Sequence, residues 1–273
     1  MKGAQRVGFI GGGNMAGALI GGLLQAGTPP HDLFALEIDP ARRAQLEKHF
    51  GIATAAGADD RLQAQDALVL AVKPQQMKEL CAALAPRIGN KLVVSIAAGI
   101  RARDIARWLG TQAIVRAMPN TPALIGQGVT GLAALPAVDA SQRAAAERIL
   151  AAVGSVVWFD DEKALDAVTA LSGSGPAYVF YFIEAMIAAG RAEGLTERQA
   201  RTLATATLAG AAQLAARSDE PVAVLRERVT SKGGTTAAAL ASLDADRVGA
   251  AIAKAIHAAS ARAQELGDEF GRG

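Results

Sequence analysis

The chain has 273 residues, with 28 basic and 26 acidic side chains and a formal net charge of +2. This length is enough for one large domain or two smaller ones. The nearly balanced charge contains no basic block, which argues against nucleic acid or a membrane surface as the main partner. The single cysteine, Cys81, excludes a disulfide framework within the chain. It is typical of a reducing compartment, so we expect a cytoplasmic protein with this thiol buried in a helix.

An apolar run, Val7–Ile10, leads directly into a glycine-rich turn. Gly11, Gly13 and Ala16 fit the pattern G-x-G-x-x-G/A. In that pattern the first glycine allows a tight turn, the second admits a pyrophosphate and the third position packs a helix on the strand. The N–H groups at the start of that helix would face the phosphates. We therefore predict a dinucleotide site, with a plain glycine-rich surface turn as the alternative. We expect neither a signal peptide nor a membrane span here.

The first half of the chain alternates apolar runs with helical patterns such as Pro40–Phe50 and Arg101–Leu109. This βαβ rhythm predicts an α/β fold, a Rossmann-type doubly wound and mostly parallel sheet with helices on both faces. The expected strands are Val7–Ile10, Leu33–Ile38, Ala67–Val72, Leu92–Ile96, Ala113–Ala117, Val129–Leu135 and Ser155–Phe159.

The pattern changes after Asp160, where no further strand is expected. We predict a dinucleotide-binding domain over residues 1–162 and an all-helical domain over residues 163–273. The helical faces carry many small apolar residues and little bulk, so we expect them to pack against a second copy, although a single-chain bundle would look similar. The expected helices are Lys163–Ala170, Ala177–Glu193, Glu197–Ala216, Val222–Arg228 and Ala245–Leu266.

Three expected strands end in loops that can line a ligand site. The carboxyl ends of parallel strands line the ligand crevice of open α/β sheets, so these loops are placed to contact a dinucleotide. Taken alone, the first loop is better explained as an ordinary strand-to-helix turn with Pro74 at the helix start. Asn120 in the stiff loop Met118–Pro122 fits either a ligand contact or closure of the turn. The residues expected to contact the cofactor are Ala71, Val72, Lys73, Pro74, Ala97, Ala98 and Asn120.

Two glycine-rich segments, Leu171–Tyr178 and Thr230–Thr236, interrupt the helical half, where glycine would otherwise destabilise a helix. The second segment concentrates hydroxyls and backbone amides at the start of a helix. Such a site can bind a small carboxylate without an arginine. The alternative is that Ser231 or Thr235 simply caps the helix, and both roles are compatible.

Five motifs occur in a fixed order along the chain, namely G-G-G-N-M-A, A-V-K-P-Q, M-P-N-T-P, S-G-S-G-P-A-Y and T-S-K-G-G-T-T. With this order and spacing the chain resembles the pyrroline-5-carboxylate reductase family from Val7 to about Leu266. The resemblance implies reduction of Δ1-pyrroline-5-carboxylate to L-proline by NAD(P)H, the last step of proline biosynthesis. It also implies a homodimer built from interlocked C-terminal helices and further assembly into a decamer of five dimers.

The resemblance also implies roles for individual residues. The substrate carboxylate would rest on Ser231 and the amides of Gly233, Gly234 and Thr235, while the Thr236 hydroxyl would bond the imine nitrogen. A threonine is too weak an acid to protonate freely, so Thr236 would orient the nitrogen and relay a proton from water, unless the iminium arrives protonated. Lys232 is expected to be a solvated or cofactor-side charge, because the family accepts other residues there. The first motif implies cofactor contacts at Gly11, Gly12, Gly13, Asn14, Met15 and Ala16.

No metal is expected, because imine reduction needs none and no Cys, His and acidic residues cluster with ligand spacing. The three histidines, His31, His49 and His257, are scattered, and we assign none of them a catalytic role.

The second expected strand is followed by signals that compete over the cofactor. Glu37 and Asp39 stand where an acid grips a ribose 2′-OH and repels a 2′-phosphate. Arg42 and Arg43 follow at once and can bind that phosphate. We expect NADP use, with NADH accepted better than in a relative that lacks Glu37. The preference between the two stays open.

Two other classes fit parts of the pattern. The β-hydroxyacid dehydrogenases share a dinucleotide domain followed by helices, but Val179 occupies the place of their catalytic lysine. A dinucleotide-sensing oligomer without chemistry is disfavoured by the intact run Thr230–Thr236. A larger-ring imine, a piperideine carboxylate, remains an alternative substrate.

Overall fold

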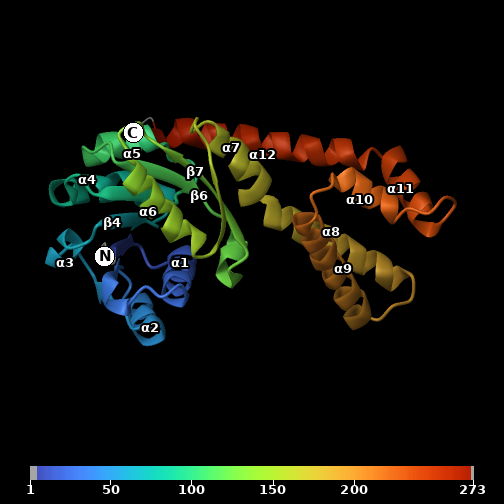
Figure 1. Ribbon diagram of the computed structural model, residues 1–273, viewed down its shortest axis with the longest axis horizontal. Coiled ribbons are helices and arrows are strands. Elements are labelled where there is room, and N and C mark those ends of the chain that lie inside the picture. Colours follow the sequence, from blue (N-terminus) through green and yellow to red (C-terminus); the bar gives the residue numbers. More distant parts are fainter. Residues whose placement is uncertain (1–4, 272–273) are drawn as a thin grey trace. The chain divides into compact units, whose positions relative to one another are not determined.

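The computed structural model describes residues 5–271 (Figure 1). In this part of the chain eight strands form one sheet, followed by a helical region. The strands are β1 (Val7–Ile10), β2 (Leu33–Leu36), β3 (Ala53–Ala55), β4 (Ala67–Leu70), β5 (Leu92–Ser95), β6 (Ile114–Met118), β7 (Gly128–Ala134) and β8 (Gly154–Trp158).

The strand order is β3-β2-β1-β4-β5-β6-β7-β8, and every neighbouring pair is parallel except β6 and β7. The doubly wound, mostly parallel α/β sheet is confirmed, and every expected strand is present. The antiparallel pair arises because β6 and β7 are joined through the 3₁₀ turn Thr121–Ile125, which is too short for a crossover. The edge strand β3 was missed.

Helices cover both faces of the sheet. The helices α1 (Asn14–Gln25), α2 (Pro40–Phe50) and α6 (Ala140–Ala151) pack on one face. The other face is covered by α3 (Asp60–Gln63), α4 (Met77–Ile88) and α5 (Ala102–Leu109). Because both faces are buried, the central strands are continuous apolar runs rather than alternating ones.

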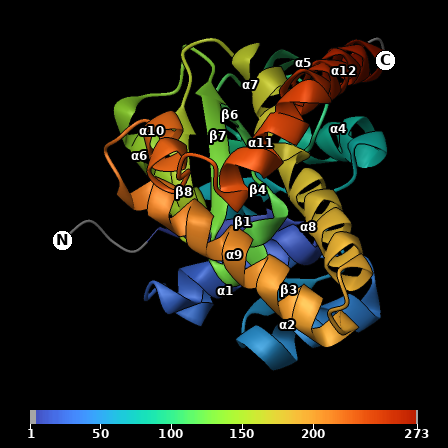
Figure 2. The same cartoon turned by 90° about the vertical axis from the view of Figure 1, so that its right-hand side faces the viewer.

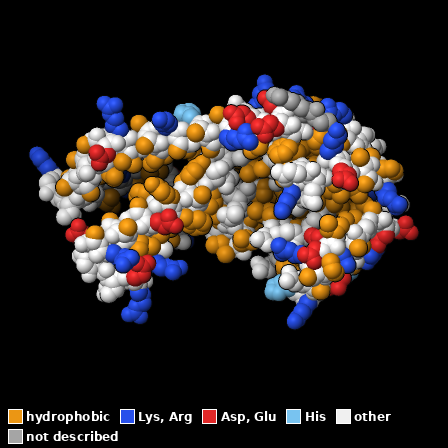
Figure 3. Space-filling model, turned by 180° about the vertical axis from the view of Figure 1, so that it is seen from behind, with side chains coloured by type: hydrophobic (Ala, Val, Ile, Leu, Met, Phe, Trp, Pro, Cys, Tyr) orange, Lys and Arg blue, Asp and Glu red, His pale blue; other side chains and the backbone are white. Residues whose placement is uncertain are grey.

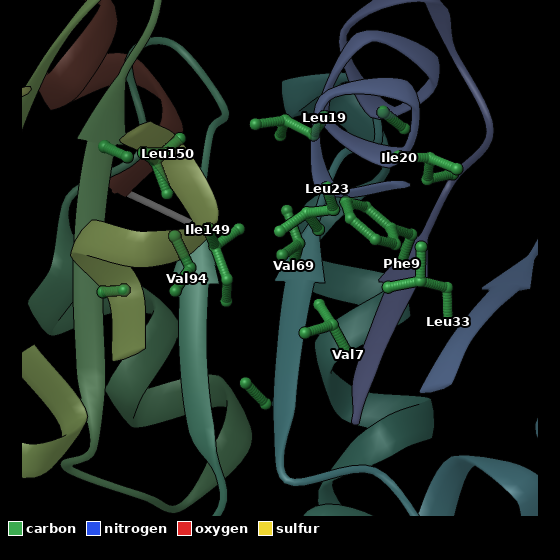
Figure 4. Close-up of a cluster of buried hydrophobic side chains, with 14 of the residues drawn as sticks. Val7, Phe9, Leu19, Ile20, Leu23, Leu33, Val69, Val94, Ile149 and Leu150 are labelled. Carbon is green, nitrogen blue, oxygen red and sulfur yellow. The ribbon is translucent and has the colours of Figure 1, made fainter. Parts of the chain in front are cut away.

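The core on the α1 side shows this packing directly. Leu19, Ile20 and Leu23 of α1 lie over Phe9 and Val69 of the sheet (Figure 4). All but Leu23, which is 6% exposed, are completely buried. The contact fixes the direction of α1 relative to β1, and so fixes the glycine turn between them.

The helical region contains α7 (Ala164–Val168), α8 (Gly175–Ala192), α9 (Glu197–Arg217), α10 (Val222–Arg228), α11 (Thr235–Ala245) and α12 (Val248–Gly271). Two expectations were wrong in detail. The segment before α8 is a π-helical turn, Thr169–Gly173, so the first glycine-rich segment is largely helical. The last helix begins at Val248, because Arg247 takes a positive φ of 52° and separates it from α11.

The chain divides into two compact units. The first ends at Ser174 and resumes at Ala259, and the second is Gly175–Ala258. The expected division after residue 162 differs because α7 packs on the sheet. A Cβ at Gly131 of β7 would lie 2.8 Å from Val168 of α7. Arg116 of β6 is buried and forms an ion pair with Asp166 of α7 at 3.7 Å.

The second unit buries little of its own apolar surface. Among its described residues only Ala200 and Ala204 are buried hydrophobics. Phe180, Tyr181 and Leu214 are 61%, 75% and 71% exposed, and apolar side chains are widespread on the visible surface (Figure 3). Figure 2, turned by 90° from Figure 1, shows α8 and α9 along their length. An apolar surface of this kind marks an interaction face.

Within residues 5–271, no helix is both long and apolar enough to cross a membrane.

Two glycines of α1 provide a matched test of the packing. A Cβ at Gly22 would lie 2.8 Å from Val153 and even closer to the Ala152 carbonyl oxygen, whereas one at Gly17 would meet only Phe50 at 3.9 Å. Gly17→Ala should raise the free energy of unfolding by about 0.5–1 kcal/mol through helix propensity. Gly22→Ala should lower it by about 1–3 kcal/mol through overpacking. Thermal and urea unfolding followed by circular dichroism measures both, and equal stability of the two variants would contradict the packing of α1 against Val153.

Candidate active site

The glycine turn after β1 joins three strand ends. Gly11 has a φ of +100°, and a Cβ there would lie 2.8 Å from the Ala71 carbonyl oxygen, so the position requires glycine. The Gly11 N–H donates to the Leu36 carbonyl oxygen at 2.8 Å, and the Ala71 N–H donates to the Ile10 carbonyl oxygen at 2.8 Å. The ends of β2, β1 and β4 are thereby held at one point.

The start of α1 is open where phosphates would bind. Gly13 is its N-cap, no side chain caps the helix, and nothing lies within 4 Å of a Cβ built at Gly13. The first N–H groups of the helix are therefore free to bind an anion. Ala16 is fully buried and Met15 packs against the core, so only their backbones remain for a cofactor. Asn14 lines a neighbouring groove along α1.

A cavity of about 430 Å³ adjoins the turn. Its walls are Gly11–Gly13, the end of β2 and the connection that follows β4. The structure thus brings together most of the cofactor residues expected in this region. Pro74 begins the 3₁₀ turn Pro74–Gln76 and is not part of the cavity wall. The expected residues that line the cavity are Gly11, Gly12, Gly13, Glu37, Ala71, Val72 and Lys73. A glycine cradle, an uncapped helix and this cavity together fit a dinucleotide.

Glu37 reaches back to the glycine turn. Its carboxylate accepts the Gly12 N–H at 2.7 Å and the Asp39 N–H at 2.9 Å. A Cβ at Gly12 would lie 3.1 Å from Glu37 Oε2, so glycine is also needed there to admit this side chain. Glu37 therefore shapes the turn and places a negative charge on the wall of the cavity.

The other charged residues after β2 are engaged elsewhere. Asp39 caps α2 by accepting the Ala41 N–H at 2.8 Å. The Arg43 guanidinium donates to the carbonyl oxygens of Glu37 and Ile38 at 2.8 and 3.0 Å. Arg42 donates to Asn14 Oδ1 at 3.3 and 3.4 Å. Both arginines would have to leave these bonds before they could bind a 2′-phosphate.

The loops that follow β5 and β6 carry the remaining residues expected to contact the cofactor. Ala97 is buried and Ala98 is half-buried after β5. Asn120, after β6, is 9% exposed and donates from Nδ2 to the Ser172 carbonyl oxygen at 3.1 Å. Its Oδ1 accepts the Val129 N–H at 2.9 Å. Both ends of the Asn120 amide are thus used to close the turn, which is one of the two roles expected from the sequence.

The segment Ser231–Thr236 lies in the second unit and gathers the expected groups. The helix α11 begins at Thr235 with Gly234 as N-cap, and no side chain caps it. The Gly234 N–H donates to the Ser231 carbonyl oxygen at 3.1 Å, and a Cβ at Gly234 would collide with Ser231 Oγ. The Ser231 hydroxyl therefore lies beside free helix amides. Lys232 is exposed to solvent, as expected.

No metal site accompanies these groups within residues 5–271, where no three His, Cys, Asp or Glu side chains gather in a metal-binding arrangement. His49 packs edge-on against Phe50, and His31 lies 3.9 Å from Asp32. Cys81 is fully buried in α4, and burial raises the pKa of its thiol to about 12. This thiol stays protonated at neutral pH.

One functional contact was missed by sequence reasoning. Arg116, which is buried, and Glu162, which is half-buried, form an ion pair at 3.0 Å, and Glu162 also accepts the Ala102 N–H at the start of α5 at 2.7 Å. Glu162 thereby supports the loop between β5 and α5. No local pattern signals a bond between residues 60 positions apart.

Comparisons with known proteins decide the family. A family model described as pyrroline-5-carboxylate reductase dimerisation matches residues 162–266, and one described as NADP oxidoreductase coenzyme F420-dependent matches residues 6–99. The chain is 45% identical to the pyrroline-5-carboxylate reductase of Pseudomonas aeruginosa, with 98% of each chain covered. The Pisum sativum enzyme is 37% identical, with 95% of each chain covered. The chain belongs to the pyrroline-5-carboxylate reductase family.

Solved structures of this family have the same fold as this chain. The Coxiella burnetii reductase superposes with a TM-score of 0.93 at 38% identity, covering 97% of this chain and 99% of its own. The Plasmodium falciparum reductase, solved with NADP bound, gives a TM-score of 0.85 at 29% identity, covering 96% and 98%. An Aquifex aeolicus prephenate dehydrogenase, at 14% identity and a TM-score of 0.55, shares the fold alone. Family membership sets aside both the β-hydroxyacid dehydrogenase and the non-catalytic alternatives.

The position of Glu37 generates a cofactor prediction. Glu37→Ser should raise the ratio of kcat/KM for NADPH to that for NADH by roughly five- to thirtyfold, the scale of one charge-assisted hydrogen bond. Replacing Arg42 and Arg43 by Gln should lower the same ratio. Steady-state kinetics with both cofactors measures each effect.

Asp39→Asn is the matched control, because its side chain caps α2 and still accepts a hydrogen bond as asparagine. An unchanged ratio in Glu37→Ser and in the arginine variant would mean that these side chains do not face the adenosine ribose.

Proposed function

We propose that this protein reduces Δ1-pyrroline-5-carboxylate to L-proline with a hydride from NADPH or NADH, the last step of proline biosynthesis. The observation that carries the proposal is the uncapped start of α11, with the Ser231 hydroxyl beside it, in a chain collinear with reductases of this name. Free amides and a hydroxyl suit a small carboxylate, and the substrate offers one next to its imine.

The first unit holds the cofactor in this proposal. Gly11–Gly13 and the first amides of α1 bind the pyrophosphate, and Glu37 with the loop Ala71–Lys73 encloses the adenosine end. Ala97 and Ala98 approach the nicotinamide end, and Asn120 reaches it only when its amide releases Ser172 or Val129. The bound dinucleotide supplies the hydride. A family model named for NADP and a family structure solved with NADP bound support NADP as a cofactor, and we propose that NADH is accepted as well.

The second unit holds the substrate. Ser231 and the amides of Gly233 and Thr235 bind the carboxylate, which fixes the ring, and the Gly234 amide joins them once it leaves the Ser231 carbonyl oxygen. The Thr236 hydroxyl donates to the imine nitrogen. When hydride adds to the imine carbon, the π pair of the C=N bond moves to nitrogen. That pair takes a proton from water through Thr236, unless the nitrogen arrives already protonated. A neutral hydroxyl orients the nitrogen without requiring a shifted pKa.

The protein forms an oligomer through the dimerisation segment that its family model describes. We propose a homodimer in which the exposed apolar faces of α8 and α9 are buried, with five dimers in a decamer and an active site that draws on both chains. The unpaired thiol of Cys81 is compatible with the cytoplasm, which remains the expected location.

The dimer interface is tested by placing a charge on its proposed face. Tyr181→Glu replaces an aromatic ring that is 75% exposed in the single chain. It should lower the association state and the imine reductase activity together, because burial of an unpaired carboxylate is costly. Light scattering coupled to gel filtration, run beside the activity assay, measures this.

Arg198→Glu, at an exposed polar position of α9, is the control and should leave both unchanged. A wild-type monomer that is active at assay concentration would refute the shared site.

The reaction itself is tested at the start of α11. Thr236→Val keeps the shape and removes the hydroxyl, so the rate of imine reduction should fall by about ten- to a thousandfold. Thr235→Val should be milder, because its amide rather than its side chain is assigned to the carboxylate. NADPH affinity should survive both changes.

Assays with pyrroline-5-carboxylate and with a piperideine carboxylate, using NADH and NADPH side by side, measure these effects. If Thr235→Val is inactive and Thr236→Val is not, the two roles are exchanged. If both keep full activity, the segment is only a helix start and the substrate assignment is wrong.

A further inference from the structure

The last turns of α12 cover the loop that follows β5. Gly99 in that loop has a φ of +74°. A Cβ at Gly99 would lie 3.1 Å from the Phe270 ring and 3.2 Å from Leu266 Cβ. The ring therefore rests directly on the peptide backbone next to Ala98. Any side chain at Gly99 would be strained and would push α12 away.

Polar contacts hold the same helix end in place. The Arg101 guanidinium donates to Asp268 Oδ1 at 2.6 Å. A Cβ at Gly267 would lie 3.1 Å from Arg101 Nε, so the helix backbone lies flat against this side chain. The Arg107 guanidinium donates to the Gly271 carbonyl oxygen at 3.1 Å. Contacts of different kinds thus tie the end of α12 to the β5–α5 loop and, through Arg107, to the last turn of α5.

The loop is supported from a second direction as well. The Ala102 N–H, the first of α5, donates to Glu162 Oε1, which also binds the buried Arg116. Neither Phe270 nor Asp268 belongs to the β5–α5 loop, to the glycine turn or to the segment Ser231–Thr236. Phe270 lies beside the backbone of Gly99, and Asp268 binds the Arg101 side chain at the end of the loop.

We propose that the last two turns of α12, Leu266–Gly271, form a clamp that positions the Ala97–Gly99 loop for the nicotinamide end of the cofactor. Phe270 and Asp268 are positioning residues in this assignment, which rests on the proposed function. A loop with a glycine at positive φ has many conformations when uncovered. Covering it with a ring and an ion pair removes most of them before the cofactor arrives, and binding then loses less conformational entropy.

The test separates the clamp from general stability. Phe270→Ala and Asp268→Asn should each weaken NADPH binding by about 3- to 30-fold, the range of indirect coupling between neighbouring sites. The KM for NADPH should rise in parallel, while kcat at saturating NADPH stays within about twofold because Thr236 and Ser231 are untouched. Phe270→Leu should restore most of the affinity. Isothermal titration with NADPH and steady-state kinetics measure these effects on the full chain.

Glu269→Gln is the matched control. Glu269 is the neighbour of both residues and pairs with Arg262 on its own helix, away from α5. It should leave NADPH affinity unchanged. Hydrogen exchange at residues 97–102 should speed up in Phe270→Ala and in Asp268→Asn but not in the control.

The possible outcomes decide separately on the clamp and on the proposed function. Wild-type NADPH affinity in Asp268→Asn and Phe270→Ala overturns the clamp, even if the melting temperature falls. Should Phe270→Ala fail to fold, Asp268→Asn decides alone, because its side chain is 53% exposed and its loss does not open the core. If the wild-type protein binds NADPH but does not reduce pyrroline-5-carboxylate, the proposed function fails, and the affinity and exchange measurements still decide the clamp.

Discussion

The position of Gly11 is the constraint on which the cofactor region depends. Its α-carbon passes so close to the Ala71 carbonyl that a methyl group would lie 2.8 Å from the oxygen. This approach lets β1 end between β2 and β4 while the chain turns into α1. The free amides at Gly13, the cavity beside Val72 and the reach of Glu37 to Gly12 all follow from that turn. The phosphate site that we propose is therefore formed by the backbone, and side chains only adjust it.

The electrostatics of the cavity explain why discrimination between NADP and NAD is expected to be incomplete. A carboxylate and a phosphate about 5 Å apart repel by about 0.8 kcal/mol in bulk water and by about 3 kcal/mol at an effective dielectric of 20. These limits correspond to discrimination from a few-fold to a few hundredfold. Glu37 is only half-buried, which favours the lower part of that range, and it already accepts two N–H groups. Arg43 can offset the repulsion only by giving up its carbonyl partners.

Local chemistry made part of this structure predictable. Strand–glycine–helix order located the turn at Gly11, and the run of small and hydroxyl residues located the start of α11. The missed parts depend on contacts across long sequence distances. The strand β3 has three residues, two of them alanine, and exists because β2 offers an edge. The antiparallel β7 reflects the short turn before it, and the bond from Ala102 to Glu162 appears only when α7 packs on the sheet.

The helix α12 is shared between the two compact units of the chain. It therefore runs from the region proposed for assembly to the loop proposed for the cofactor. Its residues Val248–Ala258 belong to the second unit, which buries little apolar surface by itself, and the rest belongs to the first unit. Helix formation is cooperative, so order in the first part of α12 favours order in the turns that carry Phe270 and Asp268. A second copy that covers the apolar face of the second unit would stabilise that first part. Under the clamp and the homodimer that we propose, linkage is reciprocal, so a cofactor that prefers the clamped loop would also favour the assembled state.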